Sequence, residues 1–256
     1  AHGAAIMNVV LETEHLVKRF GGFVATNDVS LQVAEGARHA LIGPNGAGKT
    51  TLINLLTGFL NPTSGAVRLR GEDVTRLPQH QRVRKGLART FQINRLFADL
   101  TVLESVTLAV CERRGLTRRF WRPVGAHTEA IDEAAELLRR LRLLDVAHQR
   151  TRDLAYGRQR LIEIALALAA QPTVLLLDEP AAGVPTGESR ELFETIAQLP
   201  ASVSILLIEH DMDLVFRFAD RITVLVNGAV LTDGDPMTIA NDPRVKAVYL
   251  GEGAHV

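Results

Sequence analysis

The stretch A-L-I-G-P-N-G-A-G-K-T-T-L-I-N-L-L-T-G, residues 40–58, decides the fold. Residues 37–42 predict a short buried strand, and residues 50–57 predict a helix that Gly58 ends. Between them, residues 43–50 satisfy G-x-x-x-x-G-K-[ST]. A chance glycine turn rarely has a strand before it and a helix after it, so the sequence predicts a phosphate-binding loop in an α/β protein.

The chemistry expected of this loop follows from its residue types. Glycines let the backbone curve closely around phosphate oxygens so that several N–H groups point inward, and the helix start adds the positive end of its dipole. Lys49 supplies a full positive charge to the β- and γ-phosphates, and Thr50 offers a hydroxyl to Mg²⁺. The predicted nucleotide-binding residues of the loop are Gly43, Pro44, Asn45, Gly46, Ala47, Gly48, Lys49, Thr50 and Thr51.

A second element, V-L-L-L-D-E-P at residues 174–180, ends a continuous apolar run in two carboxylates. Such a run is typical of a strand buried on both faces, and its carboxyl end lies at the edge of the sheet where the phosphate loop also lies. Asp178 can then hold Mg²⁺ through water, and Glu179 can act as the general base for an attacking water. An ordinary acidic turn would be the better interpretation of Asp-Glu alone, but not beside the phosphate loop.

The remaining pattern predicts one α/β core with two additions. Period-2 segments at residues 9–16, 29–33 and 67–69, with a turn at Gly21-Gly22, predict an N-terminal antiparallel β subdomain. Residues 94–160 have a helical period and are expected to form a helical subdomain inserted in a single domain, residues 7–251. After residue 180 the predicted helices are residues 189–198, 211–219 and 243–250, and the predicted strands are 203–208, 222–226 and 229–231. The expected fold class is therefore α/β with a mostly parallel sheet.

The middle segment carries an apolar stripe and many arginines. The stripe consists of Ile131, Ala134, Ala135, Leu138, Leu141 and Leu144. The arginines are Arg113, Arg114, Arg118, Arg119, Arg122, Arg139, Arg140, Arg142, Arg150, Arg152, Arg158 and Arg160. Two interpretations of the arginines stay open: a solvated helical face, or a contact with a partner or with anionic lipid head groups.

Composition excludes several classes of protein. The 256 residues are 46% hydrophobic and 23% charged, which is not the composition of a disordered chain. Lys+Arg and Asp+Glu both number 29, so the basic excess of a typical nucleic-acid binder is missing. Cys111 is the single cysteine, which excludes an internal disulfide and a cysteine-rich zinc site. No apolar run is long enough to span a membrane, and residues 1–6 are expected to be an expression remnant or a disordered tail.

Four further motifs carry a resemblance. L-A-Y-G-R-Q-R at residues 154–160 stands just before the Asp-Glu strand, Gln92 follows R-T-F, His210 follows I-E, and Phe20 lies in K-R-F-G. Alone, each has an ordinary structural explanation. In this order and spacing the chain resembles the ATP-binding cassette (ABC) family, from about residue 11 to residue 251. The resemblance implies the P-loop NTPase fold of an ABC ATPase.

The resemblance is closer to one subgroup. L-L-T-G-F at residues 55–59, G-L-A-R-T-F-Q at 86–92, E-P-A-A-G at 179–183, I-E-H-D-M at 208–212 and Y-L-G-E at 249–252 resemble the ATPases of branched-chain amino-acid importers. This implies a subunit that hydrolyses ATP to drive uptake of branched-chain or other hydrophobic amino acids. Importers of urea or short amides have similar ATPases and remain an alternative, as does a regulatory ABC ATPase without a transport role.

Further residue roles and partners are implied by the resemblance. Phe20 would stack on adenine, Glu179, His210 and Gln92 would be catalytic, and Thr50, Gln92 and Asp178 would serve Mg²⁺. The signature residues that would contact ATP across a dimer are Leu154, Ala155, Tyr156, Gly157 and Arg158. The implied cofactors are ATP and Mg²⁺. The implied partners are a second ABC ATPase subunit, identical or homologous, in a head-to-tail dimer, transmembrane permease subunits, and through these a periplasmic or extracellular substrate-binding protein. No nucleic acid is expected, and the chain would sit peripherally on the cytoplasmic face of the inner membrane.

Three positions depart from the family pattern. Ala155 replaces the signature serine of many relatives, so one hydroxyl toward the γ-phosphate is missing. Arg158 stands where glutamine is common and adds a charge near the partner's nucleotide. Pro185 stands where Asp or Asn is usual, and because proline has no N–H and a fixed φ, the usual hydrogen bond across the dimer is in doubt.

Other classes of nucleotide-binding protein fit less well. DNA-repair and chromosome ATPases share the phosphate and acid elements, but insert long coiled coils or zinc modules that this sequence lacks. Translation factors of the family carry two cassettes in one chain. A GTPase would need an Asn-Lys-x-Asp motif for the base, and none is found.

Overall fold

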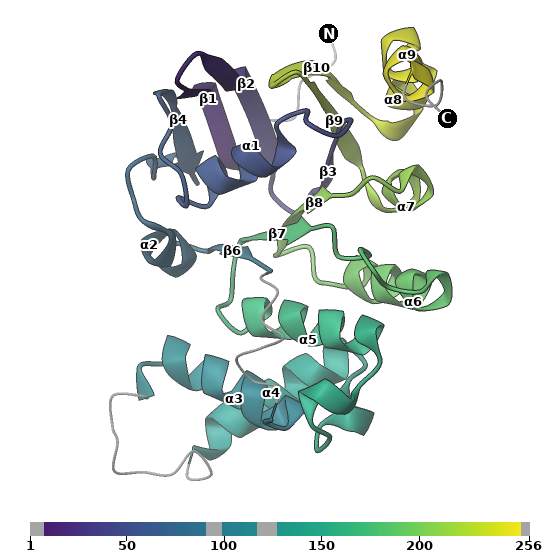
Figure 1. Cartoon of the computed structure of the whole chain (residues 1–256). Coiled ribbons are helices and arrows are strands. Elements are labelled where there is room, and N and C mark those ends of the chain that lie inside the picture. The colour runs from purple at the N-terminus through teal and green to yellow at the C-terminus, as the bar shows by residue number, and fades with distance from the viewer. Residues whose placement is uncertain (1–7, 91–98, 117–126, 252–256) are drawn as a thin grey trace, which may run out of the picture.

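A computed structural model describes residues 8–90, 99–116 and 127–251 of the chain (Figure 1). The expected tail at residues 1–6 lies outside these residues, as does the predicted catalytic and metal residue Gln92. So do Arg118, Arg119 and Arg122 of the arginine-rich segment. The predictions for these positions therefore stay predictions.

The N-terminal half contains a small antiparallel sheet in the order β2-β1-β4-β5. Its strands are β1 (Val9–Phe20), β2 (Phe23–Ala34), β4 (Ser64–Leu69) and β5 (Glu72–Asp73). β1 and β2 form a hairpin whose turn is Gly21-Gly22, where the sequence predicted it, and Phe20 pairs with Phe23 beside that turn. The predicted antiparallel sheet is therefore confirmed, with longer strands than expected.

The second sheet has six strands in the order β10-β9-β3-β8-β7-β6. These are β3 (Arg38–Ile42), β6 (Leu87–Arg89), β7 (Val174–Asp178), β8 (Ser204–Ile208), β9 (Arg221–Val226) and β10 (Ala229–Gly234). All neighbours are parallel except β9 and β10, which form a hairpin whose turn is Asn227-Gly228. The predicted fold class, α/β with a mostly parallel sheet, is confirmed.

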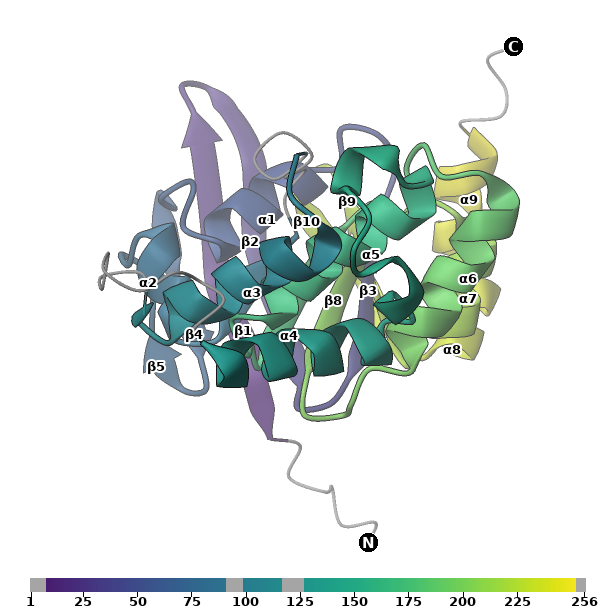
Figure 2. The same ribbon diagram turned by 90° about the horizontal axis from the view of Figure 1, so that it is seen from below.

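The helices cover both faces of this sheet. They are α1 (Lys49–Leu56), α2 (Gln79–Arg84), α3 (Val102–Arg113), α4 (Thr128–Arg140), α5 (Tyr156–Leu168), α6 (Thr186–Ala197), α7 (Met212–Phe218), α8 (Pro236–Asn241) and α9 (Pro243–Gly251). In Figure 1, α3, α4 and α5 lie at the end of the molecule opposite β1 and β2, and Figure 2 shows them side by side. Among the described residues, no helix has both the length and the apolar character that crossing a membrane requires.

Alternating side chains of the central strands divide the core in two. Leu175 and Leu177 of β7 pack with α3, α4, α5 and α6, whereas Leu176 packs with α1 and the antiparallel sheet. This period-2 alternation explains why the strand reads as an unbroken apolar run, since both of its faces are buried. The large sheet is therefore held between the antiparallel sheet with α1 on one side and the α3–α6 helices on the other.

The predicted helical stripe ends earlier than its spacing suggested. α4 stops at Arg140, and Arg142 adopts a left-handed φ of 56° that no helix can continue. Leu143 takes the buried position instead, and Leu144 is 42% exposed. The expectation that Leu144 lies on the apolar stripe is therefore wrong.

Candidate functional site

Three of the predicted site segments follow the carboxyl ends of parallel strands. The loop of residues 43–48 follows β3, the Asp178-Glu179 pair ends β7, and Glu209-His210 follows β8. β3, β8 and β7 are consecutive neighbours in the sheet and are parallel. Parallel strands end at one edge, so this topology gathers segments that are far apart in sequence, as at the ligand crevice of other open α/β sheets.

The loop of residues 43–48 depends on glycine at its two ends. Gly43 has φ 156°, and a Cβ there would lie 2.2 Å from the carbonyl oxygen of Leu225. Gly48, which caps α1, has φ 98°, and its Cβ would lie 2.5 Å from the carbonyl oxygen of Ala25. A side chain at either position would collide with backbone, so glycine is required for the loop to keep this shape.

Neighbouring backbone fixes the same loop from behind. The Gly228 N–H, in the turn between β9 and β10, donates to the Ala47 carbonyl at 2.9 Å. The Asn27 N–H of β2 donates to the Gly228 carbonyl at 2.7 Å. The loop is thereby connected through one turn to both sheets, and the Ala47 N–H closes the loop on itself by donating to the Pro44 carbonyl at 3.1 Å.

Lys49 lies at the first turn of α1 and folds back over the loop. Its Nζ donates to the carbonyls of Gly43 at 2.5 Å and Pro44 at 3.0 Å. The ammonium group therefore lies inside the curve of the loop, which is where a bound phosphate chain would need a positive charge. Thr50 and Asn45 are exposed on the same segment.

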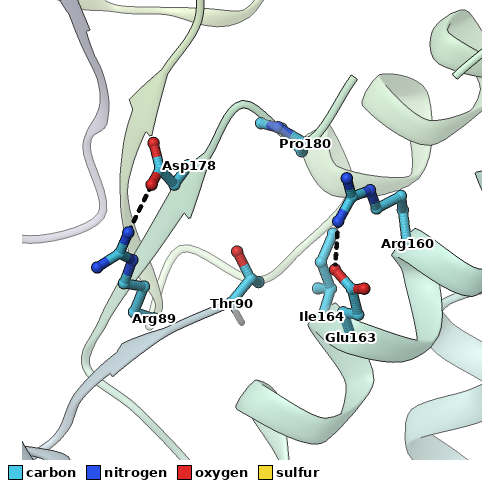
Figure 3. A pocket seen from close by; sticks show the side chains of 7 residues that line it. All are labelled: Arg89, Thr90, Arg160, Glu163, Ile164, Asp178 and Pro180. Atoms are coloured by element: carbon cyan, nitrogen blue, oxygen red, sulfur yellow. Dashed lines mark hydrogen bonds and ion pairs between the residues drawn. The ribbon is translucent and has the colours of Figure 1, made fainter. Parts of the chain in front are cut away.

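Asp178 is engaged by an arginine that the sequence did not single out. The Arg89 Nη2 lies 2.6 Å from Asp178 Oδ2, and Arg89 Nη1 donates to Asn54 Oδ1 of α1 at 3.0 Å. Figure 3 shows this pair on one side of a pocket of about 320 Å³. The buried ion pair of Arg160 and Glu163, 2.9 Å apart, lies on the other side. The pocket is thus polar on both sides.

Glu179 and His210 approach each other at the sheet edge. Glu179 adopts a left-handed φ of 47°, and its side chain is 45% exposed. The Nδ1 of His210 lies 3.9 Å from Glu179 Oε1 and 3.8 Å from Glu209 Oε2. A non-glycine residue in this conformation is uncommon, and such residues gather at functional sites.

The buried carboxylate of Glu209 binds the backbone next to Glu179 and His210. Its side chain is 1% exposed, and its two oxygens accept from the Ala181 N–H at 3.0 Å and the His210 N–H at 3.2 Å. Burial raises the pKa of the Glu209 carboxyl, while these N–H groups and His210 act in the opposite direction. Glu209 therefore joins the loop after Glu179 to the loop that carries His210.

The signature segment begins α5 with Ala155 as its N-cap, and that residue makes no side-chain cap. The Gly157 N–H donates to Glu188 Oε2 of α6 at 2.9 Å. Arg158 is paired with Asp145 at 2.6 Å, while Leu154 is buried. The start of α5 thus faces the loop that follows Glu179.

Phe20 ends β1 and is 48% exposed. The Lys18 Nζ lies 5.1 Å from the centre of its ring and also donates to the Asn61 carbonyl at 2.7 Å. One face of the ring is therefore taken by a cation–π contact, and a base could stack only on the other face. Phe23, its neighbour across the hairpin, is 67% exposed.

Oxygen ligands suited to Mg²⁺ occur at the predicted places. Thr50 offers an exposed hydroxyl and Asp178 a half-buried carboxylate, and hard oxygen donors are what Mg²⁺ prefers. Arg89 competes for Asp178, but its ion pair uses Oδ2. Within the described ranges, no group of three or more His, Cys, Asp or Glu side chains could hold a metal ion. The residues present fit a Mg²⁺ ion that also binds phosphate oxygens.

Sequence reasoning missed Arg89, Glu188 and Glu209. Arg89 lies in the quoted segment 86–92, but its partner Asp178 is 89 positions away, so no local pattern could show the pair. Glu209 directly precedes His210, and its place at the end of the apolar run Ile205–Ile208 was the available signal. Nothing in the sequence pattern linked Glu188 to Gly157.

Comparison with known proteins bears on the whole chain. Residues 26–182, more than half of the chain, match the family model described as ABC transporter. The chain is 46% identical to the high-affinity branched-chain amino acid transport ATP-binding protein LivG of Salmonella typhimurium over 253 residues, covering 95% of this chain and 98% of that protein. It is 44% identical to the corresponding BraF of Pseudomonas aeruginosa over 252 residues, with the same coverage.

A solved structure has the same fold. The crystal structure of the ADP conformation of an ATP-binding cassette from an ABC transporter superimposes with a TM-score of 0.84 at 33% identity. The match covers 95% of this chain and 99% of that one. The similarity in sequence and the similarity in structure therefore extend over nearly the same part of the chain.

Proposed function

The chain belongs to the ABC transporter family, and on that premise we propose that it is the ATP-binding and hydrolysing subunit of an importer for branched-chain or other hydrophobic amino acids. The observation that carries the proposal is the loop of residues 43–50, with Lys49 curled over it, at the carboxyl edge of the parallel sheet. The names of the similar proteins favour branched-chain amino acids over urea or short amides as cargo.

In this proposal the loop holds the phosphate chain of ATP. Backbone N–H groups of residues 43–50 and the Lys49 ammonium bind the phosphates, and Phe20 stacks on adenine with its free face. Mg²⁺, when bound to Thr50 and Asp178, neutralises phosphate charge. Gln92 joins this site as a prediction from the sequence.

Hydrolysis is assigned to the two side chains at the neighbouring strand ends. Glu179 takes a proton from the attacking water, because its exposed carboxylate lies at the sheet edge beside the loop. His210, 3.9 Å from that carboxylate, orients Glu179 and the γ-phosphate. Glu209 keeps both in place through backbone N–H groups of Ala181 and His210.

Two ATPase chains are proposed to close head to tail over the nucleotides. The start of α5, from Leu154 to Arg158, then meets the γ-phosphate bound by the other chain, since a helix start favours an anion. The partner chain is identical or homologous. The transmembrane permease subunits respond to the closing and opening of the ATPase dimer. Through them an extracellular or periplasmic binding protein delivers the cargo, with this chain on the cytoplasmic face of the membrane.

One experiment tests the proposal as a whole. The chain is assembled with the permease subunits and the binding protein of its own transport system in vesicles with enclosed Mg-ATP, and uptake of labelled leucine, isoleucine, valine and urea is measured. Uptake of the branched-chain amino acids together with phosphate release is expected. Uptake of urea alone would identify the transport system as the alternative, an importer of urea or short amides. A lack of phosphate release would contradict the ATPase assignment.

A further inference from the structure

A carboxylate of this chain accepts a hydrogen bond from the N–H of the second residue of α5, Gly157. Glu188 Oε2 accepts from the Gly157 N–H at 2.9 Å, and Glu188 covers Gly157, which is buried. A Cβ on Gly157 would lie 2.7 Å from the same oxygen, so glycine is required for the carboxylate to come this close. Charge-assisted bonds of this kind are among the stronger hydrogen bonds in proteins.

Pro185 explains why Glu188 points toward α5. Pro185 is the N-cap of α6, and Glu188 stands three positions later, where a capping-box glutamate bonds the N-cap N–H. α3 has such a box, in which Thr101 N–H donates to Glu104 Oε2 at 2.8 Å. Proline has no N–H to offer, so Glu188 cannot close a box on its own helix and bonds Gly157 instead.

Further contacts join the same two segments. Arg160 Nη2 lies 3.4 Å from the Ala182 carbonyl and 2.7 Å from the Tyr156 hydroxyl. The Tyr156 ring lies against Gly183, where a Cβ would be 3.4 Å from it. The start of α5 is thus tied to the loop that follows Glu179, and Glu188 is the member of this group that carries a negative charge onto the amide.

Resting on the proposed function, in which the start of α5 receives the γ-phosphate held by the partner chain, we propose that Glu188 competes with that phosphate for the Gly157 N–H. One N–H cannot serve two anions fully, and a carboxylate and a phosphate at hydrogen-bond distance repel each other. Closing of the dimer therefore requires Glu188 to leave Gly157. Glu188 is a positioning residue that raises the nucleotide concentration at which two chains close.

The test compares Glu188→Gln with the parent and with Glu191→Gln, an exposed residue one turn along α6 that removes the same charge. Sedimentation velocity measures dimer formation against the concentration of adenylyl imidodiphosphate, a non-hydrolysable ATP analogue, with Mg²⁺. Fluorescent ADP measures binding to the single chain. We expect Glu188→Gln to reach half-maximal dimer at about tenfold less analogue, with ADP affinity unchanged and Glu191→Gln like the parent.

A second variant separates competition from simple loss of charge. Pro185→Asn restores an N-cap N–H and side chain, so Glu188 can close a capping box on α6 while the net charge stays the same. We expect the half-maximal concentration to fall by about threefold. Adding Pro185→Asn to Glu188→Gln should produce no further fall, whereas a further fall would assign the effect to a hydrogen bond from position 185 across the dimer and contradict the role of Glu188.

Three further results would overturn the inference: no shift in Glu188→Gln, a shift to higher analogue concentration, or no dimer in any variant although all bind the analogue. Failure of the parent to bind either nucleotide would instead overturn the proposed function.

Discussion

At the residue scale, Glu179 combines exposure with a backbone conformation that its neighbours impose. Its N–H donates to the Ile208 carbonyl of β8 at 2.9 Å, and its φ is 47°. The strand register therefore fixes the backbone of Glu179 and the direction in which its side chain leaves the sheet edge. A group held in this way is suited to accept a proton from a water at one fixed position.

Glu179→Gln removes the base and keeps the shape of the side chain. We expect phosphate release to slow by about 10²–10⁴-fold, because a positioned general base contributes that much, while ATP binding stays intact. Phosphate release and binding of fluorescent ATP are measured on the same preparation. Glu194→Gln, an exposed residue of α6, is the matched control. Turnover of Glu179→Gln at the parental rate would show that another group is the base.

His39 predicts a pH dependence of stability. It is fully buried on β3, with Nε2 2.7 Å from the Thr223 hydroxyl and 3.6 Å from Asp233 Oδ2. Burial lowers its pKa from 6.5 to about 4, against the opposing attraction of Asp233. Between pH 6.5 and about 4, the unfolded chain binds a proton at His39 that the folded chain does not bind. The free energy of unfolding therefore decreases as the pH falls from 6.5 to about 4.

The loss is expected to reach about 3 kcal/mol, and urea unfolding at several pH values measures it. His39→Gln should flatten this part of the profile. The matched control is His148→Gln, which removes an exposed histidine by the same substitution. An unchanged slope in His39→Gln would mean that other groups cause the acid sensitivity.

Local sequence predicted the residues whose chemistry follows from a motif, but not those whose role is a long-range contact. The phosphate loop and the Asp178-Glu179 pair were readable because strand, loop and helix are contiguous there. Arg89 was not, since its carboxylate partner comes from another strand. For the same reason the contact of Glu188 with Gly157, 31 positions apart, had no signal in the sequence.

At the element scale, the missed elements are the short ones. β5, β6, α2 and α8 span two, three, six and six residues, too few to show a period. α8 nevertheless had a readable start, because Asp235 caps it and Pro236 occupies its first turn. The later core strands β8 and β9 and the helices α6 and α7 were predicted to within a few residues, because their apolar faces are buried, whereas β2 begins at Phe23 rather than at the predicted residue 29.

Arg82 of α2 shows why that short helix exists. It is fully buried and donates to the carbonyls of Leu55, Leu56, Leu77 and Thr75 at 2.6–2.9 Å. Two of these belong to the last turn of α1, where the Leu55 carbonyl has only a long 3.3 Å bond from the Gly58 N–H besides the Arg82 guanidinium. Burial lowers the pKa of Arg82 to about 10, so the side chain stays charged at neutral pH.

Arg82→Met should therefore destabilise the protein by about 3 kcal/mol or more, because it leaves several buried carbonyls without donors. Urea unfolding measures the change. Arg84→Met, on the exposed side of α2, should cost less than about 0.5 kcal/mol. Equal effects of the two substitutions would remove Arg82 from this role.

At the scale of the whole molecule, the parallel sheet is the element that positions the predicted site residues. The parallel sheet brings the phosphate loop, the acid pair and His210 to one edge, and α3–α6 cover its far face. The arginines of the α3–α5 region are largely matched by nearby carboxylates: Arg113 and Arg114 pair with Glu133, and Arg139 and Arg140 with Glu136. The subdomain limits at residues 94 and 160 stay a prediction.

Nucleotide binding should stabilise the whole fold. A ligand at about a hundred times its dissociation constant adds about 2.7 kcal/mol to the free energy of unfolding if it binds the folded chain alone. We expect Mg-ATP and Mg-ADP to raise the melting temperature of the parent and of Lys246→Ala, an exposed control. In Lys49→Ala the shift should nearly vanish, because the ammonium inside the loop is lost. A full shift in Lys49→Ala would contradict the proposed phosphate site.

The Gly228 turn, bonded forward to Ala47 and back to Asn27, has a consequence for how this molecule tolerates change. It connects the antiparallel sheet, through Asn27 of β2, with the phosphate loop, through Ala47. A residue inserted into this turn would weaken the support of the phosphate loop without altering any group proposed to bind ATP. A substitution of Gly228 would do the same, because a Cβ there would lie 2.8 Å from the Ala25 carbonyl oxygen. Mutations in this turn are therefore expected to impair transport although they lie outside the proposed nucleotide site.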